Sequence, residues 1–435
     1  MATPESATTP VSLAVAGAGW RRRLRSLAPK ILALCLSLTL CLGLAELGLR
    51  LSGAPPAARP IGDALLGFGT IPNRVETFNF PEYGGMLTMK TNNLGFHDDT
   101  DTPIQKPSHT YRVAFVGDSQ TAGECANHES FPHEFERLMN QSGSSATHVE
   151  VLNAGVGRYS PYQYYVKTSS QIVPLKPDHL IVGIYLGNDF MDLMRPDDRP
   201  YLTWQPDGSI RPHRPQFVML DDPASPPSML ESLRLFGLMR QLAGPTLLYE
   251  VRRANLLLHD AAGNRNGLLA AFRYMLEVKQ LTDISLGFMT QSLLQQVWFR
   301  HFPDTLPVAF RFDRYVMAQF KALCAANGIR LTYLIVPTKL QVEPEEMGPV
   351  LAKVAAHDPS MTTAALQGFE NRLADELLQA GRDLGVEVLD VRQALIERRA
   401  GRRFYNPEEM HLTPAGNRAM ALRLYELLNG SIRAR

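Results

Sequence analysis

Short apolar runs alternate with longer amphipathic stretches along most of the chain. The apolar runs predict buried strands at 112–116, 149–155, 178–189, 329–337 and 386–391. Positions with helical spacing predict helices at 131–140, 161–173, 313–327, 363–384 and 414–429. Continuous apolar strands alternating with helices are typical of a parallel sheet covered on both faces, with right-handed crossovers. The predicted fold class is therefore α/β, with a doubly wound sheet of five parallel strands.

Residues 192–304 interrupt this alternation. Apolar residues recur at 229, 230, 233, 236, 239 and 242, which is the stripe of an amphipathic helix. This pattern predicts a mainly helical insertion, either a cap that packs on itself or a lid that shapes a substrate site. Trp204, in the loop "YLTWQPDG", is a candidate for stacking on a sugar.

The N-terminal segment combines a basic cluster with a long apolar run. The basic residues are Arg21, Arg22, Arg23, Arg25 and Lys30. Between Lys30 and Arg50 the one charged residue is Glu46. An apolar run of this length can cross a hydrocarbon core, and a basic flank stays in the cytoplasm. We therefore expect an uncleaved signal anchor at 31–51 that exports the rest of the chain. A cleaved signal peptide and a buried soluble helix are the alternatives.

These features divide the chain into six predicted segments. They are a cytoplasmic basic N-terminus (1–30), a transmembrane anchor (31–51), a linker with a partly β-structured lead-in (52–110), a first catalytic part (111–191), the helical insertion (192–304) and a second catalytic part (305–435).

Composition excludes some classes of function. The 44 basic and 43 acidic residues leave a net charge of +1, and the body of the chain contains no basic block. Nucleic acid is therefore not an expected partner. Cys125 and Cys324 could pair in an oxidising compartment, but sequence alone does not bring them within bonding distance.

Polar residues follow three of the predicted strands. The first strand ends in "GDS" with Ser119, the second in "NAGVGRYS", and the third in "LGND" with Asn188. A fourth polar stretch, "NPEEMHLTPAGN", follows the last strand and contains His411. Ligands of open α/β sheets bind outside the carboxyl ends of the strands. We therefore expect these four places to meet at one edge of the sheet.

The residue types at this edge suit acyl transfer. A serine hydroxyl is a weak nucleophile that needs an adjacent base, and neutral imidazole can take its proton near pH 7. Ser119 and His411 fit these two roles. A carboxylate should hold the imidazole in the correct tautomer, and Glu408 and Glu409 are the candidates.

The oxyanion that forms in acyl transfer needs preorganised donors. The candidates are the backbone N–H of Ser119, a backbone N–H in the turn at 155–158, and the side-chain amide of Asn188.

Two histidine-containing stretches are weaker candidates for metal binding. "HDDTD" at 97–101 is typical of a solvated turn, and "HESFPHE" at 128–134 places Pro132 between its histidines. The sequence contains no His-Glu-x-x-His zinc signature. We therefore expect neither a metal nor an organic cofactor.

The four polar blocks, in this order, resemble those of the SGNH or GDSL-type hydrolases. The resemblance covers residues 112–189 and 313–429, and "NNLGFHD" before the first strand is similar to a membrane-anchored bacterial subgroup. It implies a flavodoxin-like sheet and catalysis without a cofactor. It also implies that Ser119 is the nucleophile, His411 the base and Asn188 the side-chain oxyanion donor.

The chain departs from the family pattern at two positions. Family members often have a second glycine where this chain has Arg158, so we take Gly157 as the backbone donor. The family usually has aspartate three residues before the histidine, where this chain has Glu408. Glutamate is one methylene longer, so a Ser–His dyad with help from a carboxylate is an alternative to a full triad.

The expected function is that of a membrane-anchored serine esterase. It would act through an acyl-enzyme on an ester or O-acyl group of a glycan or lipid. The expected location is the inner membrane, with a single pass and a periplasmic catalytic domain. The alternatives are an O-acyltransferase or acetylesterase that modifies a cell-surface polysaccharide, and a non-catalytic scaffold or glycan-binding protein.

Overall fold

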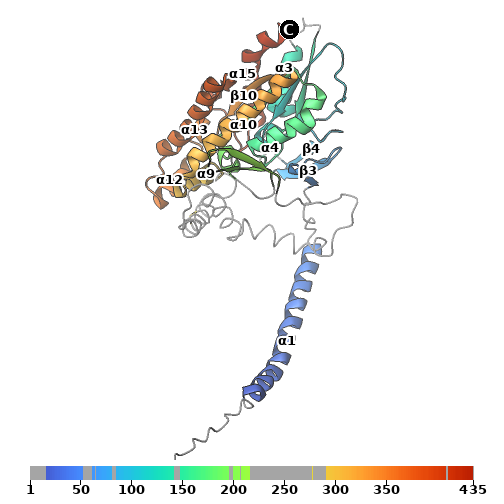
Figure 1. Cartoon of the computed structure of the whole chain (residues 1–435), viewed down its shortest axis with the longest axis vertical. Coiled ribbons are helices and arrows are strands. Elements are labelled where there is room, and N and C mark those ends of the chain that lie inside the picture. Colours follow the sequence, from blue (N-terminus) through green and yellow to red (C-terminus); the bar gives the residue numbers. More distant parts are fainter. Residues whose placement is uncertain are drawn as a thin grey trace, which may run out of the picture. The chain divides into compact units, whose positions relative to one another are not determined.

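The structure of the protein is a computed structural model, shown in Figure 1. It describes residues 16–51, 61–63, 65–80, 85–141, 147–194, 199–205, 207–215, 277, 291–407 and 410–434. The chain divides into two compact units, one of 1–59 with 224–244 and one of 60–223 with 245–435. All the strands lie in the second unit.

Helix α1 (Ala16–Leu51) contains the predicted anchor at 31–51. Several of its leucines are exposed, including Leu34, Leu36 and Leu40. No helix among the described residues is both long enough and apolar enough to span a membrane.

Five parallel strands form the central sheet. They are β5 (Thr110–Val116), β6 (His148–Asn153), β7 (His179–Tyr185), β10 (Arg330–Val336) and β11 (Glu387–Asp390), in the spatial order β11-β10-β7-β5-β6. Numbered along the chain, this is the 2-1-3-4-5 order of flavodoxin-like sheets. The predicted fold class and all five predicted strands are confirmed.

Helices cover both faces of this sheet (Figure 1). Alternate residues of β5 enter two separate cores, because Val113 and Phe115 point to one face and Ala114 and Val116 to the other. The first core contains α3 (Phe131–Gln141), α14 (Arg392–Arg399) and α15 (Pro414–Arg433). The second core contains α4 (Pro161–Lys167), α9 (Gln291–His301), α10 (Thr305–Asn327) and α13 (Thr363–Leu384).

Two helices differ from their predicted bounds for reasons that involve proline. Helix α10 begins at Thr305 rather than at 313, and Pro307 fits its first turn, where an N–H has no intrahelical acceptor. The helix predicted at 161–173 changes after Lys167 into a π turn at Thr168–Ile172 and a 3₁₀ turn at Val173–Leu175. Pro174 in the latter turn cannot donate the hydrogen bond that an α-helix requires.

In the described part of the chain, three antiparallel hairpins form separate two-stranded sheets, and a helix follows α11 (Lys339–Val342). The hairpins are β1–β2 (Ile61–Asp63, Gly67–Gly69), β3–β4 (Val75–Phe80, Gly85–Lys90) and β8–β9 (Tyr201–Trp204, Ile210–His213), and the helix is α12 (Gly348–His357). Hairpin β8–β9 and helix α9 are described parts of the insertion predicted as mainly helical. The predicted helical stripe at 229–242 lies outside the described residues.

Three side chains whose roles the sequence left open have defined surroundings. Cys125 and Cys324 are both buried, and neither forms a disulfide. Trp204, the candidate for sugar stacking, carries the Arg311 guanidinium over its ring at 4.4 Å from the ring centroid. One face of that indole is therefore already covered by the protein's own cation.

Asp313 of α10 provides a test of how burial couples stability to pH. Its side chain is buried, and burial raises its pKa to about 7. Because the folded-state pKa lies above the ordinary value of 3.8, the stabilising neutral form is lost as pH rises from about 4 to 7. We expect Asp313→Asn to raise the free energy of unfolding at pH 8 by about 1–4 kcal/mol relative to the parent, with little change at pH 4. Urea unfolding at both pH values measures this difference, and an equal effect at both would contradict it.

Candidate active site

Ser119 lies where the first strand of the sheet turns into a short helix. Strand β5 ends at Val116, and α2 (Ser119–Ala122) begins with the serine. The side chain of Asp118 caps this helix by accepting a hydrogen bond from the Gln120 N–H at 2.9 Å. A Cβ on Gly117 would lie 2.0 Å from Thr121 Oγ1, so only glycine fits this turn. The turn leaves the Ser119 N–H at a helix N-terminus, without an intrahelical acceptor.

His411 contacts Ser119 directly. Its Nε2 atom lies 2.8 Å from Ser119 Oγ, and the imidazole is almost completely buried. This distance is within the range of a hydrogen bond between a nucleophile and its general base. The two residues are far apart in the sequence, so their contact depends on the fold.

The loop that carries His411 is closed by its own backbone. Asn406 N–H donates to His411 O at 2.9 Å, and Thr413 N–H donates to Phe404 O at 2.9 Å. A backbone bridge also joins Tyr405 to Leu412. These bonds close a tight loop just before α15.

Two side chains fasten this loop to the sheet edge. Lys339 begins α11 (Lys339–Val342), directly after β10, and its Nζ donates to the carbonyl oxygens of Asn406 at 2.5 Å and Pro407 at 2.7 Å. Gln120 Nε2 donates to Met410 O at 3.0 Å. The residue after Ser119 is therefore bonded to the residue before His411.

Among the residues that the structure describes, Glu124 places a carboxylate at the imidazole. Its Oε2 lies 3.3 Å from His411 Nδ1, and its side chain is 32% exposed. The predicted acid Glu408 and the alternative Glu409 lie outside the described residues, so their positions are not tested. Sequence reasoning missed Glu124, although it belongs to the same block, "GDSQTAGE", as the serine. Gly123, at φ +82°, makes the turn between α2 and Glu124.

The glycine turn after β6 packs against the serine. A Cβ on Gly155 would lie 2.3 Å from Ala122 N, and one on Gly157 would lie 3.7 Å from Ser119 Cβ. The predicted backbone donor Gly157 is therefore adjacent to the nucleophile. Arg158 has φ +69°, a left-handed conformation that glycine adopts without strain, and its guanidinium lies over the Phe68 ring at 5.3 Å.

The predicted donor Asn188 is held by a buried ionic pair. It is the N-cap of α5 (Asp189–Asp192), just after β7, and its Nδ2 donates to Asp192 Oδ2 at 2.7 Å. Asp192 Oδ1 lies 3.4 Å from Arg199 Nη1, and both of these side chains are buried. An amide nitrogen carries two hydrogens, so Nδ2 keeps one for an oxyanion. Neither Asp192 nor Arg199 could be identified from the sequence, because their pairing is a tertiary contact.

Buried carboxyl groups lie behind the catalytic edge. Burial raises the pKa of Asp118 to about 7. The hydrogen bond from Gln120 and the charge of His411 lower this pKa, but burial is the larger effect. Burial and the neighbouring Asp118 raise the pKa of Asp189 well above its usual range. Asp189 accepts hydrogen bonds from the Tyr185 N–H and the Tyr164 hydroxyl, each at 2.9 Å. Both aspartates therefore order the loops around the site.

The two histidine stretches contact each other, and His133 lies in the first turn of α3. His133 Nε2 lies 2.7 Å from the His97 carbonyl oxygen, and Asp98 accepts from Thr100 at 2.9 Å. In the part of the chain that the structure describes, no three histidine, cysteine or acidic side chains are grouped as metal ligands.

Comparison with protein families gives a match to the C-terminal part of the chain. Residues 309–433 match the family described as "SGNH hydrolase-like domain, acetyltransferase AlgX". Residues 309–433 are therefore similar to an SGNH hydrolase-like domain. The sequence blocks around Ser119, Asn188 and His411 predicted this family, and the enzyme class that they predicted, a serine hydrolase of the SGNH type, is confirmed. No curated protein matches the chain.

Solved structures that are similar to this chain include a lipase/acylhydrolase and two acetylxylan esterases. A lipase/acylhydrolase from Enterococcus faecalis has 10% identity and a TM-score of 0.34, over 74% of this chain and 96% of that one. The acetylxylan esterase Axe2 from Geobacillus stearothermophilus has 10% identity and a TM-score of 0.35, over 73% and 93%. The acetyl xylan esterase AlAXEase has 11% identity and a TM-score of 0.34, over 73% and 99%. At such low TM-scores these similarities carry no argument about this chain's substrate.

Substitution of the three glutamates would identify the carboxylate that orients His411. We expect Glu124→Gln to lower kcat/KM for an aryl ester on the order of 10²-fold, because the imidazole loses the partner that fixes its tautomer. Glu408→Gln and Glu409→Gln carry the same change of charge and test the two acids predicted from the sequence. Steady-state kinetics on the three folded variants makes the comparison. A large loss in Glu408→Gln with none in Glu124→Gln would reverse the assignment.

Proposed function

We propose that this SGNH domain is an acyl esterase that acts through an acyl-enzyme. Ser119 Oγ attacks the ester carbonyl while His411 Nε2 takes the hydroxyl proton, and the same proton is then given to the departing alcohol. Water attacks the acyl-enzyme in the second half, again with His411 as base. The observation that carries this proposal is the 2.8 Å contact between Ser119 Oγ and His411 Nε2.

The other groups of the site support the two tetrahedral intermediates. The negative oxygen would accept hydrogen bonds from the N–H groups of Ser119 and Gly157 and from Asn188 Nδ2. The Asp192–Arg199 pair fixes the direction of that amide, so the donor need not reorganise during the reaction. Glu124 would keep the second imidazole proton on Nδ1 and stabilise the imidazolium.

An O-acetyl group on a glycan is the substrate class we favour. The description of the family that matches residues 309–433 names an acetyltransferase, AlgX, which supports an acetyl group as the acyl group. The same acyl-enzyme can react with a sugar hydroxyl in place of water. Transfer of an acyl group to a cell-surface polysaccharide is therefore the second candidate function.

Ser119→Ala is the direct test of the proposed nucleophile. We expect this variant to lose at least 10³-fold in hydrolysis of an aryl acetate, because no hydroxyl remains to form the acyl-enzyme. Ser170→Ala, at an exposed serine, is the matched control and should keep full activity. Aryl acetate turnover and labelling by a fluorophosphonate probe are the two measurements.

The outcomes separate the candidate functions. Full activity in Ser119→Ala would overturn the proposal, and a folded parent protein that neither turns over ester nor takes up the probe would favour a non-catalytic scaffold. If the parent is active, added glycan that captures the acetyl group in competition with water would favour the transferase.

We also propose that α1 attaches the protein to the inner membrane, with the catalytic part on the outer side. The basic cluster before residue 31 and the exposed leucines of α1 support this location. In a bacterial host, the full chain should remain in the membrane pellet after washing at high salt. Its catalytic part should be digested by protease in spheroplasts, and protection from protease would contradict the proposed topology.

A further inference from the structure

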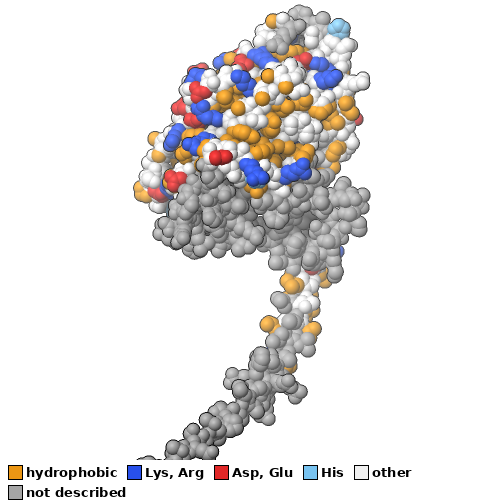
Figure 2. Space-filling model, viewed as in Figure 1, with side chains coloured by type: hydrophobic (Ala, Val, Ile, Leu, Met, Phe, Trp, Pro, Cys, Tyr) orange, Lys and Arg blue, Asp and Glu red, His pale blue; other side chains and the backbone are white. Residues whose placement is uncertain are grey.

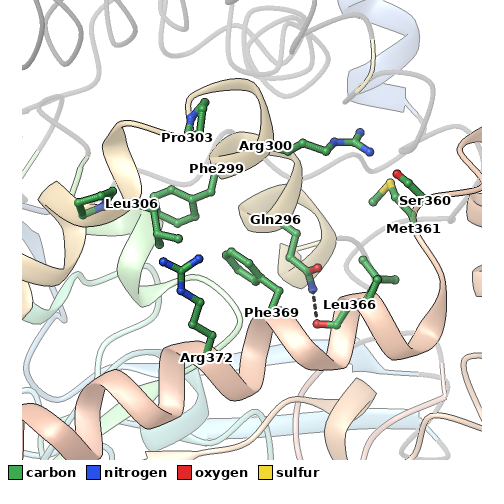
Figure 3. Close-up of a pocket in the computed structure, with 12 residues that line it drawn as sticks. Gln296, Phe299, Arg300, Pro303, Leu306, Ser360, Met361, Leu366, Phe369 and Arg372 are labelled. Carbon is green, nitrogen blue, oxygen red and sulfur yellow. Dashed lines mark hydrogen bonds between the residues drawn. The ribbon is translucent and has the colours of Figure 1, made fainter.

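A cavity distinct from the candidate active site lies between α9, α10 and α13 (Figure 3). Its volume is about 360 Å³. The walls are mainly apolar and include Phe299, Leu306, Met361, Leu366 and Phe369. None of the residues assigned to catalysis is among the described residues that line this cavity, so a ligand bound there would be distinct from the substrate of the candidate active site.

Most polar groups in the cavity wall are engaged by the protein. Gln296 Nε2 donates to Leu366 O at 3.2 Å, which is the dashed line in Figure 3. Arg300 forms ion pairs with Glu277 and Asp358. These contacts fix the wall and leave little polar capacity for a ligand.

Arg372 is the exception. Its guanidinium lies over the Phe310 ring at 5.8 Å, and it makes no hydrogen bond or ion pair with any residue that the structure describes. Figure 3 shows this side chain rising from α13 toward Phe299 and Leu306. In Figure 2, basic side chains also gather along the lower edge of the face, below a broad area of hydrophobic side chains. A planar cation at an apolar cavity favours a planar anion, which it can bind through two parallel hydrogen bonds.

We propose that this cavity binds a carboxylate with a linear apolar tail, such as a medium-chain fatty acid anion. Its carboxylate would pair with Arg372, and its tail would lie against Phe299, Leu306 and Phe369. The cavity is at the small end of the range for ligand pockets, which suits one short chain. One guanidinium without an ionic partner in the described chain matches a single negative charge.

One helix contacts both the cavity and the segment that carries Asn188. Helix α9, which lines the cavity through Phe299, also holds the segment around Asn188. Gln295 of the same helix accepts from the Met191 N–H at 3.0 Å and donates to Leu186 O at 2.7 Å. A bound ligand therefore contacts the helix that anchors the predicted oxyanion donor. The binding itself does not depend on Ser119 acting as a nucleophile.

Titration of the full chain with four small ligands tests the proposal. The Ser119→Ala variant is used so that binding is read without turnover, and isothermal calorimetry measures the affinity. Octanoate carries both the charge and the tail, 1-octanol only the tail, octylamine the opposite charge, and acetate only the charge. We expect octanoate to bind at least tenfold more tightly than each of the other three. Equal affinity for octanoate and octanol, or no octanoate binding, would overturn the proposal.

Three substitutions locate the binding. Arg372→Gln should lower octanoate affinity at least tenfold and leave octanol affinity unchanged. Arg382→Gln, at an exposed arginine near the end of the same helix, is the matched control and should change neither. Ala365→Trp adds bulk at the cavity wall from an exposed helical position and should abolish binding of both ligands. Equal losses in Arg372→Gln and Arg382→Gln would show that octanoate binds the basic surface and not this cavity.

Discussion

The hydrogen bonds of Lys339 hold the candidate active site together. A buried ammonium group is costly unless its hydrogens are accepted, and here two carbonyl oxygens of the His411 loop accept them. Lys339 follows β10, whereas Ser119 follows β5, and β7 lies between these two strands. Lys339 thus holds the His411 loop at the edge of the sheet. The hydrogen bond from Gln120 to Met410 then positions that loop relative to Ser119. Lys339 thereby supports the 2.8 Å contact between Ser119 Oγ and His411 Nε2.

Close approach of backbones is the second constraint on this edge. Gly117 and Gly155 lie where any side chain would collide with α2. They allow the turns after β5 and β6 to pack directly on each other, and the N–H groups of two separate segments can then face one point. Arg158 is a different case, because it adopts the left-handed backbone conformation that glycine favours although it carries a side chain. Its side chain packs on Phe68 and so contributes contacts that a glycine would lack.

The sequence predicted the features that depend on residues close together in the chain. The strands were predicted because short apolar runs of this length are typical of buried strands. Ser119 and His411 were predicted because their polar blocks come after strands. Glu124 was not found, since its approach to His411 depends on the turn at Gly123 and on contacts between distant segments. The Asp192–Arg199 pair was missed for the same reason. Hairpin β8–β9 was missed because it is short and lies in a segment whose other stretches have helical spacing.

The electrostatics of the site favour charge on His411 at the moment when catalysis creates it. A positive imidazole lowers the pKa of Asp118, and by linkage an ionised Asp118 makes protonation of His411 more favourable. Burial opposes this ionisation, so Asp118 remains near its point of half-protonation around neutral pH. Transfer of the serine proton to His411 would therefore draw negative charge onto Asp118. Glu124, which is partly exposed, supplies the direct contact on Nδ1. The imidazolium is thus supported from two sides, by a solvated carboxylate in contact and by a buried one that responds to its charge.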